Sequence, residues 1–594
     1  MKFRALHKVL SFQLLPILLL LLLPTVMEAQ FIFTTNNGSI TITGYNGNPT
    51  VLNIPSSTNG FPVTSIAISA FANKSSLTTA IIPNSVTNIG GNAFGSCHSL
   101  NSLTIGSSIV SIGPYAFQAC GVLRNVTIPD SVNSIGDYAF QSCGLTNASV
   151  GNGVTAVGNY TFNNDYALIS ISIGTNVVTI GNYAFAACQA LSDVTIPNSV
   201  TSIGSYAFNL DCPGLKNITI GTNVTSIGAN AFNTCNALTN IIIPDSVANI
   251  GSLAFFMCLD LTNATIGQGL LSIGDGAFQN CKTLTSVTIP AGVTIIGNNV
   301  FNSCYALTNC TLGSGVTSIG NSAFAGCSVL TGFTLPSAVV SIGNYAFQSC
   351  SSLNVSIPNT VTNIGSYAFQ GDSKLRGINI PNSITSIGSY TFDGCQRLTS
   401  IIIPDSVTTI ANNAFSGCYS VTNLSFGNGV TSIGTNAFMF DQHFANVTIP
   451  SSITNLGSYA FQYCFGLTSV YFTGNAPSAD STVFVNLPNT SAAPPTVYYL
   501  PGTTGWGTST FGGAPAVLWL PVIANNSSFG VQSNQFGFNV NWANNMAVVV
   551  EACTDLSNPL WLSLQTNTVT SGTAYFSDSG WTNFTGRFYR LRWP

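Results

Sequence analysis

A phenylalanine recurs about every 23 residues along most of this chain, and steps of 22 or 24 residues occur only three times. A fixed period between about 20 and 50 residues is typical of folds built by stacking one structural unit many times. The periodicity therefore predicts a solenoid. The series runs Phe71, Phe94, Phe117, Phe140, Phe162, Phe185, Phe208, Phe232, Phe255, Phe278, Phe301, Phe324, Phe347, Phe369, Phe392, Phe415, Phe438 and Phe461.

One repeat, residues 238–255, shows how each unit is expected to fold. Ile241 and Ile243 alternate with outward positions, which predicts a short strand. Pro244 lacks a backbone donor and ends that strand. Ala254 and Phe255 then begin a compact turn, expected to be helical, that places the ring in the interior.

No single unit of this kind can fold alone. About six apolar side chains per unit contribute roughly 1.5–3 kcal/mol each when buried. Ordering the unit costs about 1–2 kcal/mol per residue in backbone entropy. Stability must therefore come from contacts between neighbouring units, and parallel stacking creates one continuous core.

The composition favours a folded chain with an uncharged polar surface. Apolar residues make up 45% of the 594 residues and charged residues only 5%, with a formal net charge of −4. Nucleic-acid binding needs clustered Lys and Arg to neutralise phosphates, and no such cluster follows the N-terminus. Neither nucleic acid nor an anionic membrane surface is an expected partner.

Residues 1–29 have the pattern of a secretory signal peptide. Lys2, Arg4 and Lys8 precede an apolar run at 9–26, and Ala29 offers a cleavage position. The alternative is a membrane anchor, since the run is near the minimum spanning length. We expect cleavage and export, with no transmembrane segment left in the mature chain, which would be secreted or held at the cell surface.

The repeats resemble a known family. Residues 284–290 and 316–327 follow the motif L-T-x-V-x-I-P-x-S-V-T-x-I-G-x-x-A-F-x-x-C, and the resemblance covers residues of about 64–475. This pattern is similar to the BspA-like leucine-rich repeats of bacterial surface antigens. The resemblance implies binding to proteins or to host and neighbour cell surfaces, with no defined chemistry.

We divide the chain into five segments. Residues 1–29 are the signal peptide, 30–63 an N-terminal β cap, and 64–475 a solenoid of about 18 repeats. Residues 476–519, rich in Pro, Gly, Ser and Thr, form a terminal cap or linker. Alternating segments within 520–594 predict a small all-β module.

Cysteine recurs three residues after the repeat phenylalanine in most units. Metal binding, redox chemistry or disulfides between neighbouring units are possible uses of such a column. Buried thiols that pack at the turn are the preferred interpretation, because C-x-x-C pairs are absent and some units hold Asp165, Asp211, Asp372, Asp441 or Lys74 instead. The column comprises Cys97, Cys120, Cys143, Cys188, Cys235, Cys258, Cys281, Cys304, Cys327 and Cys350, with later members Cys395, Cys418 and Cys464.

Tyrosine often precedes the repeat phenylalanine by two positions, and this stripe is the candidate binding surface. It could hold a glycan or a protein, or it could cover the edge of the core. Its members are Tyr115, Tyr138, Tyr160, Tyr183, Tyr206, Tyr345, Tyr367 and Tyr390.

The outward strand position is often hydroxylic, as at Thr195 and Thr219. A column of such residues could order water in the manner of ice-binding solenoids, or it could reflect the strand preference of Thr.

Catalysis has little support in the sequence. Only His98 and His443 remain after residue 29, and Glu551 is the single Glu there. We predict no catalytic residues, no metal site and no cofactor. The expected function is an exported, non-catalytic repeat protein that presents an extended surface for protein binding or cell-surface adhesion. A structural surface-layer or matrix component and a glycan-binding module are the alternatives.

Overall fold

The computed structural model describes residues 30–209, 212–486, 493–507 and 509–593. These residues form two compact units, and the division falls between residues 353 and 354. The predicted signal peptide at residues 1–29 lies outside the described residues.

The first unit begins with a small antiparallel element. Strand β1 (Phe31–Asn36) pairs antiparallel with β2 (Ser39–Tyr45), and β2 pairs parallel with β5 (Phe61–Ile66). Strand β4 (Ser57–Thr58) forms a hairpin with β5, and β3 (Val51–Asn53) pairs parallel with the first strand of the repeats. These strands supply the edge on which the first repeat stacks.

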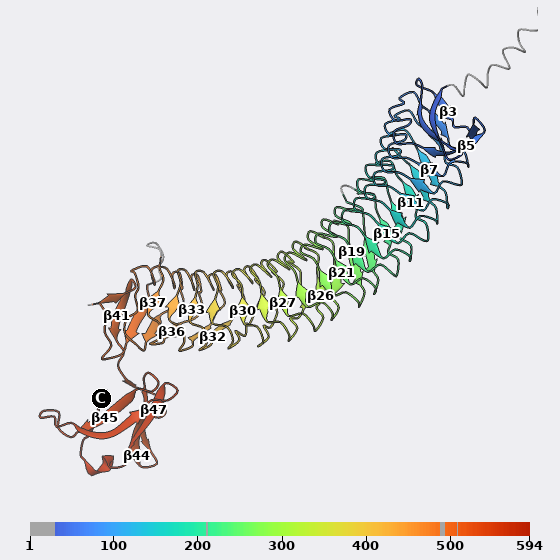
Figure 1. Ribbon diagram of the computed structural model, residues 1–594. Coiled ribbons are helices and arrows are strands. Elements are labelled where there is room, and N and C mark those ends of the chain that lie inside the picture. The colour runs from blue at the N-terminus through green and yellow to red at the C-terminus, as the bar shows by residue number, and fades with distance from the viewer. Residues whose placement is uncertain (1–29, 210–211, 487–492, 508, 594) are drawn as a thin grey trace, which may run out of the picture. The chain divides into compact units, whose positions relative to one another are not determined.

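Most of the following coils contribute two strands, a first and usually longer one and a second of two residues, and strands of each kind form parallel sheets that run over several coils (Figure 1). The longer strands of the first unit are β6 (Thr79–Ile81), β8 (Ser102–Thr104), β10 (Asn125–Ile128), β12 (Asn147–Val150), β14 (Ser170–Ser172), β16 (Asp193–Thr195), β18 (Asn217–Thr219), β20 (Asn240–Ile243), β22 (Asn263–Ile266), β24 (Ser286–Thr288), β26 (Asn309–Thr311) and β28 (Gly332–Phe333). The shorter strands are β7 (Asn88–Ile89), β9 (Ser111–Ile112), β11 (Ser134–Ile135), β13 (Ala156–Val157), β15 (Thr179–Ile180), β17 (Ser202–Ile203), β19 (Ser226–Ile227), β21 (Asn249–Ile250), β23 (Ser272–Ile273), β25 (Ile295–Ile296), β27 (Ser318–Ile319) and β29 (Ser341–Ile342).

The β-solenoid with a period of about 23 residues is the predicted fold class, and it is confirmed. Within β20 the side chains alternate as expected for a strand with one buried face. Ile241 and Ile243 are each 1% exposed, whereas Ile242 between them is 68% exposed. The coils also approach one another closely: a Cβ on Gly251 would lie 2.4 Å from the backbone nitrogen of Ala229 in the preceding coil.

The turn around the repeat phenylalanine differs from the helical turn expected at Ala254 and Phe255. Leu253 and Met257, two residues to either side of the ring, have φ of 56°. The amides of Leu253, Phe255 and Met257 donate to carbonyls of the next coil at 2.8–2.9 Å, and the residues between them donate within their own coil. Alternate amides thus point along the solenoid, which an α-helix does not permit.

The repeat phenylalanines form one buried stack in the first unit. From Phe71 to Phe347 adjacent ring centroids lie 5.1–5.7 Å apart and the rings are nearly parallel. All of these rings are 0% exposed. Each coil therefore uses its neighbours' rings as its own core.

The second unit continues the same plan. Its longer strands are β32 (Ser400–Ile403), β34 (Asn423–Phe426), β36 (Asn446–Ile449) and β38 (Ser469–Phe472), and its shorter strands are β30 (Asn363–Ile364), β31 (Ser386–Ile387), β33 (Thr409–Ile410), β35 (Ser432–Ile433) and β37 (Asn455–Leu456). Phe484 extends the ring stack beyond Phe461, with centroids 5.6 Å apart.

The parallel sheet also continues into the segment after the repeats. Strand β39 (Thr496–Tyr499) pairs parallel with β38, and β41 (Ala514–Leu518) pairs parallel with β39. Strand β40 (Thr510–Phe511) pairs antiparallel with β41. This hairpin ends the stack of parallel strands.

The C-terminal module is all-β, as predicted. One sheet holds β42 (Val522–Ile523), β43 (Gly530–Gln532), β44 (Gln535–Asn541) and β47 (Thr573–Asp578), and the other holds β45 (Ala547–Cys553), β46 (Leu562–Thr568) and β48 (Phe588–Arg592). The 3₁₀ turn η1 (Trp581–Asn583) is the only helical segment in the described part of the chain. No helix there is long and apolar enough to cross a membrane.

The two adjacent isoleucines of β20 test the repeat core. Ile241→Ala should lower the free energy of unfolding by about 2–5 kcal/mol, because it leaves a cavity in the continuous core. Ile242→Ala, its matched control, should change it by less than about 0.5 kcal/mol. Denaturant unfolding measures both values, and equal losses would contradict the described strand register.

Candidate functional site

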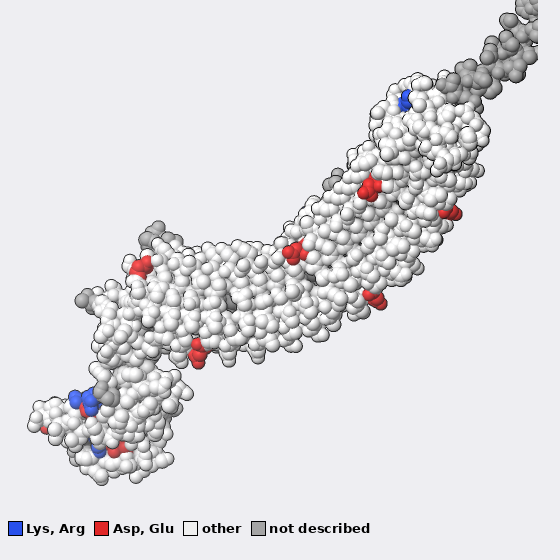
Figure 2. Space-filling model, viewed as in Figure 1, with Lys and Arg blue, Asp and Glu red and all other residues white. Residues whose placement is uncertain are grey.

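Charged side chains are sparse on the solenoid. Figure 2 shows one face on which acidic and basic residues are isolated among uncharged ones. The part of the solenoid surface seen in this view is therefore made mostly of uncharged side chains.

The cysteine column lies inside the solenoid, and its members are buried thiols. Each Sγ in the column donates to the carbonyl oxygen of the repeat phenylalanine in the preceding coil, over 3.0 Å for Cys143 and 3.5 Å for Cys235. The thiol thus supplies a weak donor for a buried backbone acceptor.

Burial also makes these thiols unreactive. It raises the pKa of the Cys258 and Cys327 thiols to about 12 and the pKa of Cys188 and Cys235 well above the ordinary value. The thiolate is the nucleophile and metal ligand. A column that stays protonated and enclosed acts as packing.

Asp165 occupies the cysteine position in its coil and is 0% exposed. Its Oδ1 accepts hydrogen bonds from the amides of Cys143, Gly144 and Leu145 in the preceding coil, at 2.7, 2.8 and 3.4 Å. Its Oδ2 has no hydrogen-bond partner. Desolvation raises the pKa of this carboxyl well above its ordinary value, although the three amides oppose the shift. Asp211, at the equivalent position in another coil, lies outside the described residues.

The tyrosine stripe of the first unit is a stack of parallel rings. Centroids of successive rings from Tyr115 to Tyr206 lie 4.5–4.7 Å apart, and the ring planes differ by 2–6°. In the second unit Tyr367 and Tyr390 stack at 4.6 Å. Tyr345 is 37% exposed.

Each of these tyrosines has a left-handed backbone. The φ angles of Tyr115, Tyr138 and Tyr160 are 60°, 62° and 57°. Such a conformation costs a non-glycine residue about 1–3 kcal/mol. Some other coils have Asn92 or Gly276 at the equivalent position, and Asn and Gly adopt the left-handed conformation more readily.

Stacking of the tyrosine rings determines which parts of each ring a ligand can contact. Because neighbouring rings cover one another's faces, the inner rings expose only edges and hydroxyl groups. A sugar that packs on an aromatic face has room only at the ends of the stack, as at Tyr115, which is 39% exposed. The stripe is suited to hydrogen bonding along its edge.

The outward side of the longer strands carries two columns of mostly uncharged polar groups, with Asp193 as a charged member. Asn147 donates to Asn125 at 3.1 Å, and Asn217 donates to Asp193 at 2.7 Å, so one column is a hydrogen-bonded ladder. The other column contains the hydroxylic residues. Both columns border a groove of about 670 Å³, which is lined by Ile171, Ser172, Ile173, Thr175, Asp193, Thr195, Ile196, Pro197, Asn198, Ser199 and Thr219.

The few residues suited to acid–base chemistry have structural contacts. His98 Nδ1 lies 3.0 Å from the carbonyl oxygen of Ala119, and His443 contacts the carbonyl of Tyr419. Glu551 pairs with Arg590 and Arg592, in each case with a closest N–O distance of 2.7–2.8 Å. Within the described ranges no group of three or more His, Cys, Asp or Glu residues could hold a metal ion.

The arrangement is that of a leucine-rich-repeat solenoid whose outward side chains form regular columns. The model of the family described as "BspA type Leucine rich repeat region (6 copies)" matches residues 45–169, 155–281, 249–376 and 362–491. The chain therefore belongs to the BspA-type leucine-rich-repeat family. This family is a repeat scaffold, and no enzyme family is indicated.

Solved structures with similarity to the chain are also repeat proteins. A leucine-rich repeat protein from Bacteroides ovatus is 25% identical over 74% of this chain and 93% of its own, with a TM-score of 0.44. A leucine rich cell surface protein from Faecalibacterium prausnitzii is 27% identical over 75% of this chain and 94% of its own, with a TM-score of 0.26. No curated protein matches the sequence.

Sequence reasoning missed one group of residues that the structure brings together. Tyr471 stacks against Tyr498 at 5.0 Å and contacts Trp519 at 4.6 Å between ring centroids. The available signal was Tyr471 itself, the aromatic residue among the few that interrupt the hydroxylic column. Residues 498 and 519 lie outside the period, so spacing could not find them.

Asp165 makes the local stability of its coil pH-dependent. Its folded-state pKa lies above the unfolded one, so its contribution is present at low pH and is lost as pH rises through the folded-state pKa. Asp165→Asn should remove this loss. In this variant the amides of Cys143 and Gly144 should be better protected against hydrogen exchange than in wild type. Between the unfolded-state and folded-state pKa of Asp165, this advantage should grow by up to about tenfold per pH unit. A ratio that is constant with pH would refute the assignment.

The tyrosine stack makes a second prediction. Burial, together with Tyr160 and Tyr115 on either side, raises the pKa of Tyr138. Tyr160→Asn should lower the pKa of Tyr138 toward its ordinary value, since Asn accepts the left-handed backbone and removes the neighbouring phenol. Titration of ¹³Cζ-labelled tyrosines by NMR measures the shift. Tyr390→Asn is the control and should leave Tyr138 unchanged.

Proposed function

We propose that this protein is exported and acts as a non-catalytic scaffold that binds a protein ligand at or outside the cell surface. Its family membership supports a repeat scaffold whose role is binding. The single observation that carries the proposal is the outward face of the longer strands, where exposed uncharged side chains repeat once per coil.

This outward face is suited to an extended partner. Thr195, Thr219 and Thr265 are exposed, and Ile242 among them is 68% exposed. Side chains in register on parallel strands lie about 4.8 Å apart, so a partner meets the same chemistry in successive coils. Repeat proteins commonly use such continuous surfaces for binding.

Export is the part of the proposal that depends on the N-terminus. Lys2, Arg4 and Lys8 followed by the apolar run at 9–26 support a signal peptide. Cell fractionation and N-terminal sequencing test this part, and a mature chain that starts at Gln30 is the expected result.

Two exposed isoleucines on different strand columns test the binding face. Chain 30–594 is used to capture ligands from cell-envelope extracts, and the affinity of each captured protein is then measured. Ile242→Lys should weaken binding at least about tenfold, because it places a charge on the neutral contact face. Ile295→Lys, the control at a residue 56% exposed on a shorter strand, should have little effect.

The salt dependence of the same affinity provides an independent check. A contact between neutral groups should change less than about threefold between about 0.05 M and 0.5 M salt. A steep loss of affinity with salt would contradict the proposed face. Self-assembly of the chain into sheets without ligand would favour the structural-matrix alternative.

A further inference from the structure

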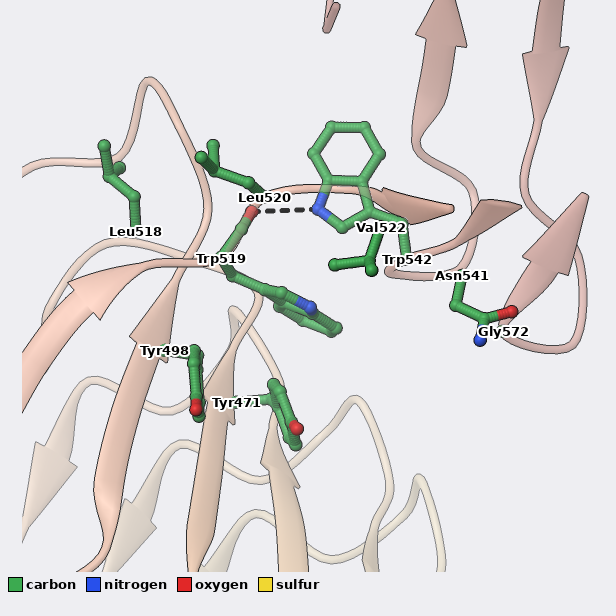
Figure 3. Close-up of a pocket in the computed structure, with 9 residues that line it drawn as sticks. All are labelled: Tyr471, Tyr498, Leu518, Trp519, Leu520, Val522, Asn541, Trp542 and Gly572. Atoms are coloured by element: carbon green, nitrogen blue, oxygen red, sulfur yellow. Dashed lines mark hydrogen bonds between the residues drawn. The ribbon is translucent and has the colours of Figure 1, made fainter. Parts of the chain in front are cut away.

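A second candidate site lies at the end of the repeats, where the outward column of hydroxylic residues ends. Tyr471, Tyr498, Leu518, Trp519, Leu520, Val522, Asn541, Trp542 and Gly572 line a cavity of about 480 Å³ (Figure 3). This volume lies within the range of about 300–1,000 Å³ that is typical of small-ligand sites. In Figure 3 the Asn541 side chain lies across the cavity from the rings of Trp519 and Tyr471.

The parallel sheet positions the aromatic side of this cavity. Tyr471 on β38 pairs in register with Tyr498 on β39, so both rings project from the same sheet face. The amide of Trp519 donates to the carbonyl of Tyr499 at 2.7 Å, which fixes the residue that follows β41. Trp519 is therefore held by the backbone, and its ring is half-buried.

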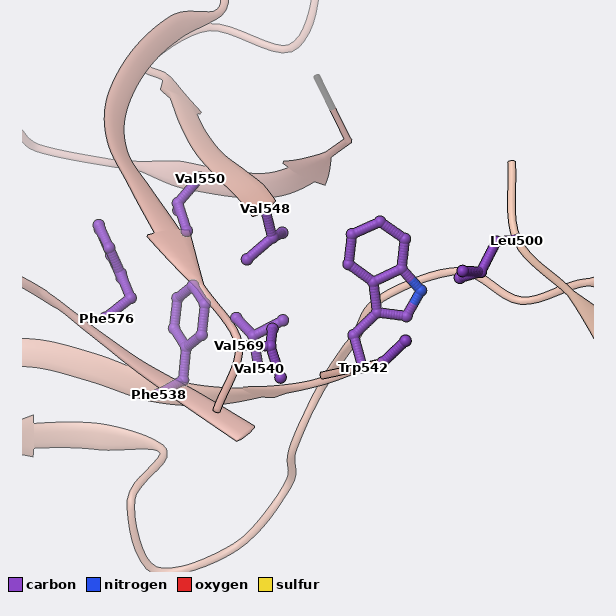
Figure 4. Packing of buried hydrophobic residues seen from close by; sticks show 9 residues of the cluster. Leu500, Phe538, Val540, Trp542, Val548, Val550, Val569 and Phe576 are labelled. Atoms are coloured by element: carbon purple, nitrogen blue, oxygen red, sulfur yellow. The ribbon is translucent and has the colours of Figure 1, made fainter. Parts of the chain in front are cut away.

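The core of the C-terminal module holds the other side. Trp542 is 3% exposed and packs with Leu500, Val540, Val548 and Val569, among others (Figure 4). Its indole Nε1 donates to the carbonyl of Trp519 at 2.9 Å. Asn541, the preceding residue on β44, consequently points its amide away from that core and is exposed.

Several residues that line the cavity carry polar side-chain groups that make no hydrogen bonds with one another. Among the described residues, the hydroxyls of Tyr471 and Tyr498, the indole Nε1 of Trp519 and the side-chain amide of Asn541 make no hydrogen bond. Together they offer donors and acceptors beside aromatic surface. No lining residue carries a charge.

We infer that this cavity binds a neutral carbohydrate. Sugars combine apolar C–H faces, which pack on aromatic rings, with hydroxyl groups that both donate and accept hydrogen bonds. The indole face of Trp519 would take the apolar face, and Asn541 with the tyrosine hydroxyls would take the hydroxyl groups. An anionic sugar would find no cation here to pair with its charge.

This site differs from the tyrosine stripe, where neighbouring rings close one another's faces. Here the neighbouring Tyr471 ring is tilted by 46° to the plane of Trp519. Site and stripe are thus separable by mutation. The site also lies at the end of the repeats and away from Ile242, so the inference does not depend on the protein ligand proposed above.

The test uses chain 30–594 and four uncharged hexasaccharides: those of cellulose, laminarin, xylan and mannan. Tryptophan fluorescence and calorimetry report binding. Trp519→Ala should weaken the binding of at least one of them by more than about tenfold, and Asn541→Ala by about threefold to tenfold. Asn541 is exposed and its side chain makes no hydrogen bond, so its variant keeps the fold. Trp593→Ala, at a tryptophan 39% exposed elsewhere in the module, should bind as wild type does.

Three results would overturn the inference. One is the absence of binding to all four saccharides. Another is saccharide binding that survives Trp519→Ala and Asn541→Ala but is lost in a Tyr183→Ala/Tyr206→Ala variant, which would place the sugar on the stripe. The third is preferential binding of a proline-rich peptide, the other ligand class that aromatic grooves accept.

Discussion

Contact between successive coils is the interaction on which the rest of this structure depends. In every second position of the phenylalanine turn the amide donates to the next coil, as Leu253, Phe255 and Met257 do. The buried rings stack at the same step. A coil removed from its neighbours would lose both its backbone acceptors and the two faces of its ring. The solenoid is therefore stabilised by contacts between neighbouring coils and not by a separate hydrophobic core within each coil.

This constraint divides the chain into a uniform interior and a variable exterior. Inside, even polar substitutions serve coil-to-coil contact, since the Asp165 carboxylate accepts the amides of the preceding coil where other coils use a thiol. Outside, Ile242 and the threonines Thr219 and Thr265 are chemically different side chains at equivalent, exposed positions. Both binding sites proposed above therefore lie on the exterior columns or where the period ends.

The sequence predicted the interior well because burial imposes a period. The 23-residue step identifies the solenoid, and the alternation of Ile241 and Ile243 identifies the strand. The turn was harder to predict, because its left-handed positions are filled by Tyr in many coils and tyrosine does not signal that conformation as Asn or Gly does. Phe484 lies one period after Phe461 and was predictable. The grouping of Tyr471 with Trp519 and Asn541 was not, since it arises from non-periodic segments folding against the last coils.

The central claim is that each coil is stabilised mainly by its neighbours. The most direct measurement is the free energy of unfolding of fragments that start at residue 30 and end at successive coil boundaries within residues 30–353. We predict that the shortest fragments are unfolded and that stability then rises by a nearly constant increment with each added coil. A single coil that folds alone, or a stability that does not change with the number of coils, would contradict the account.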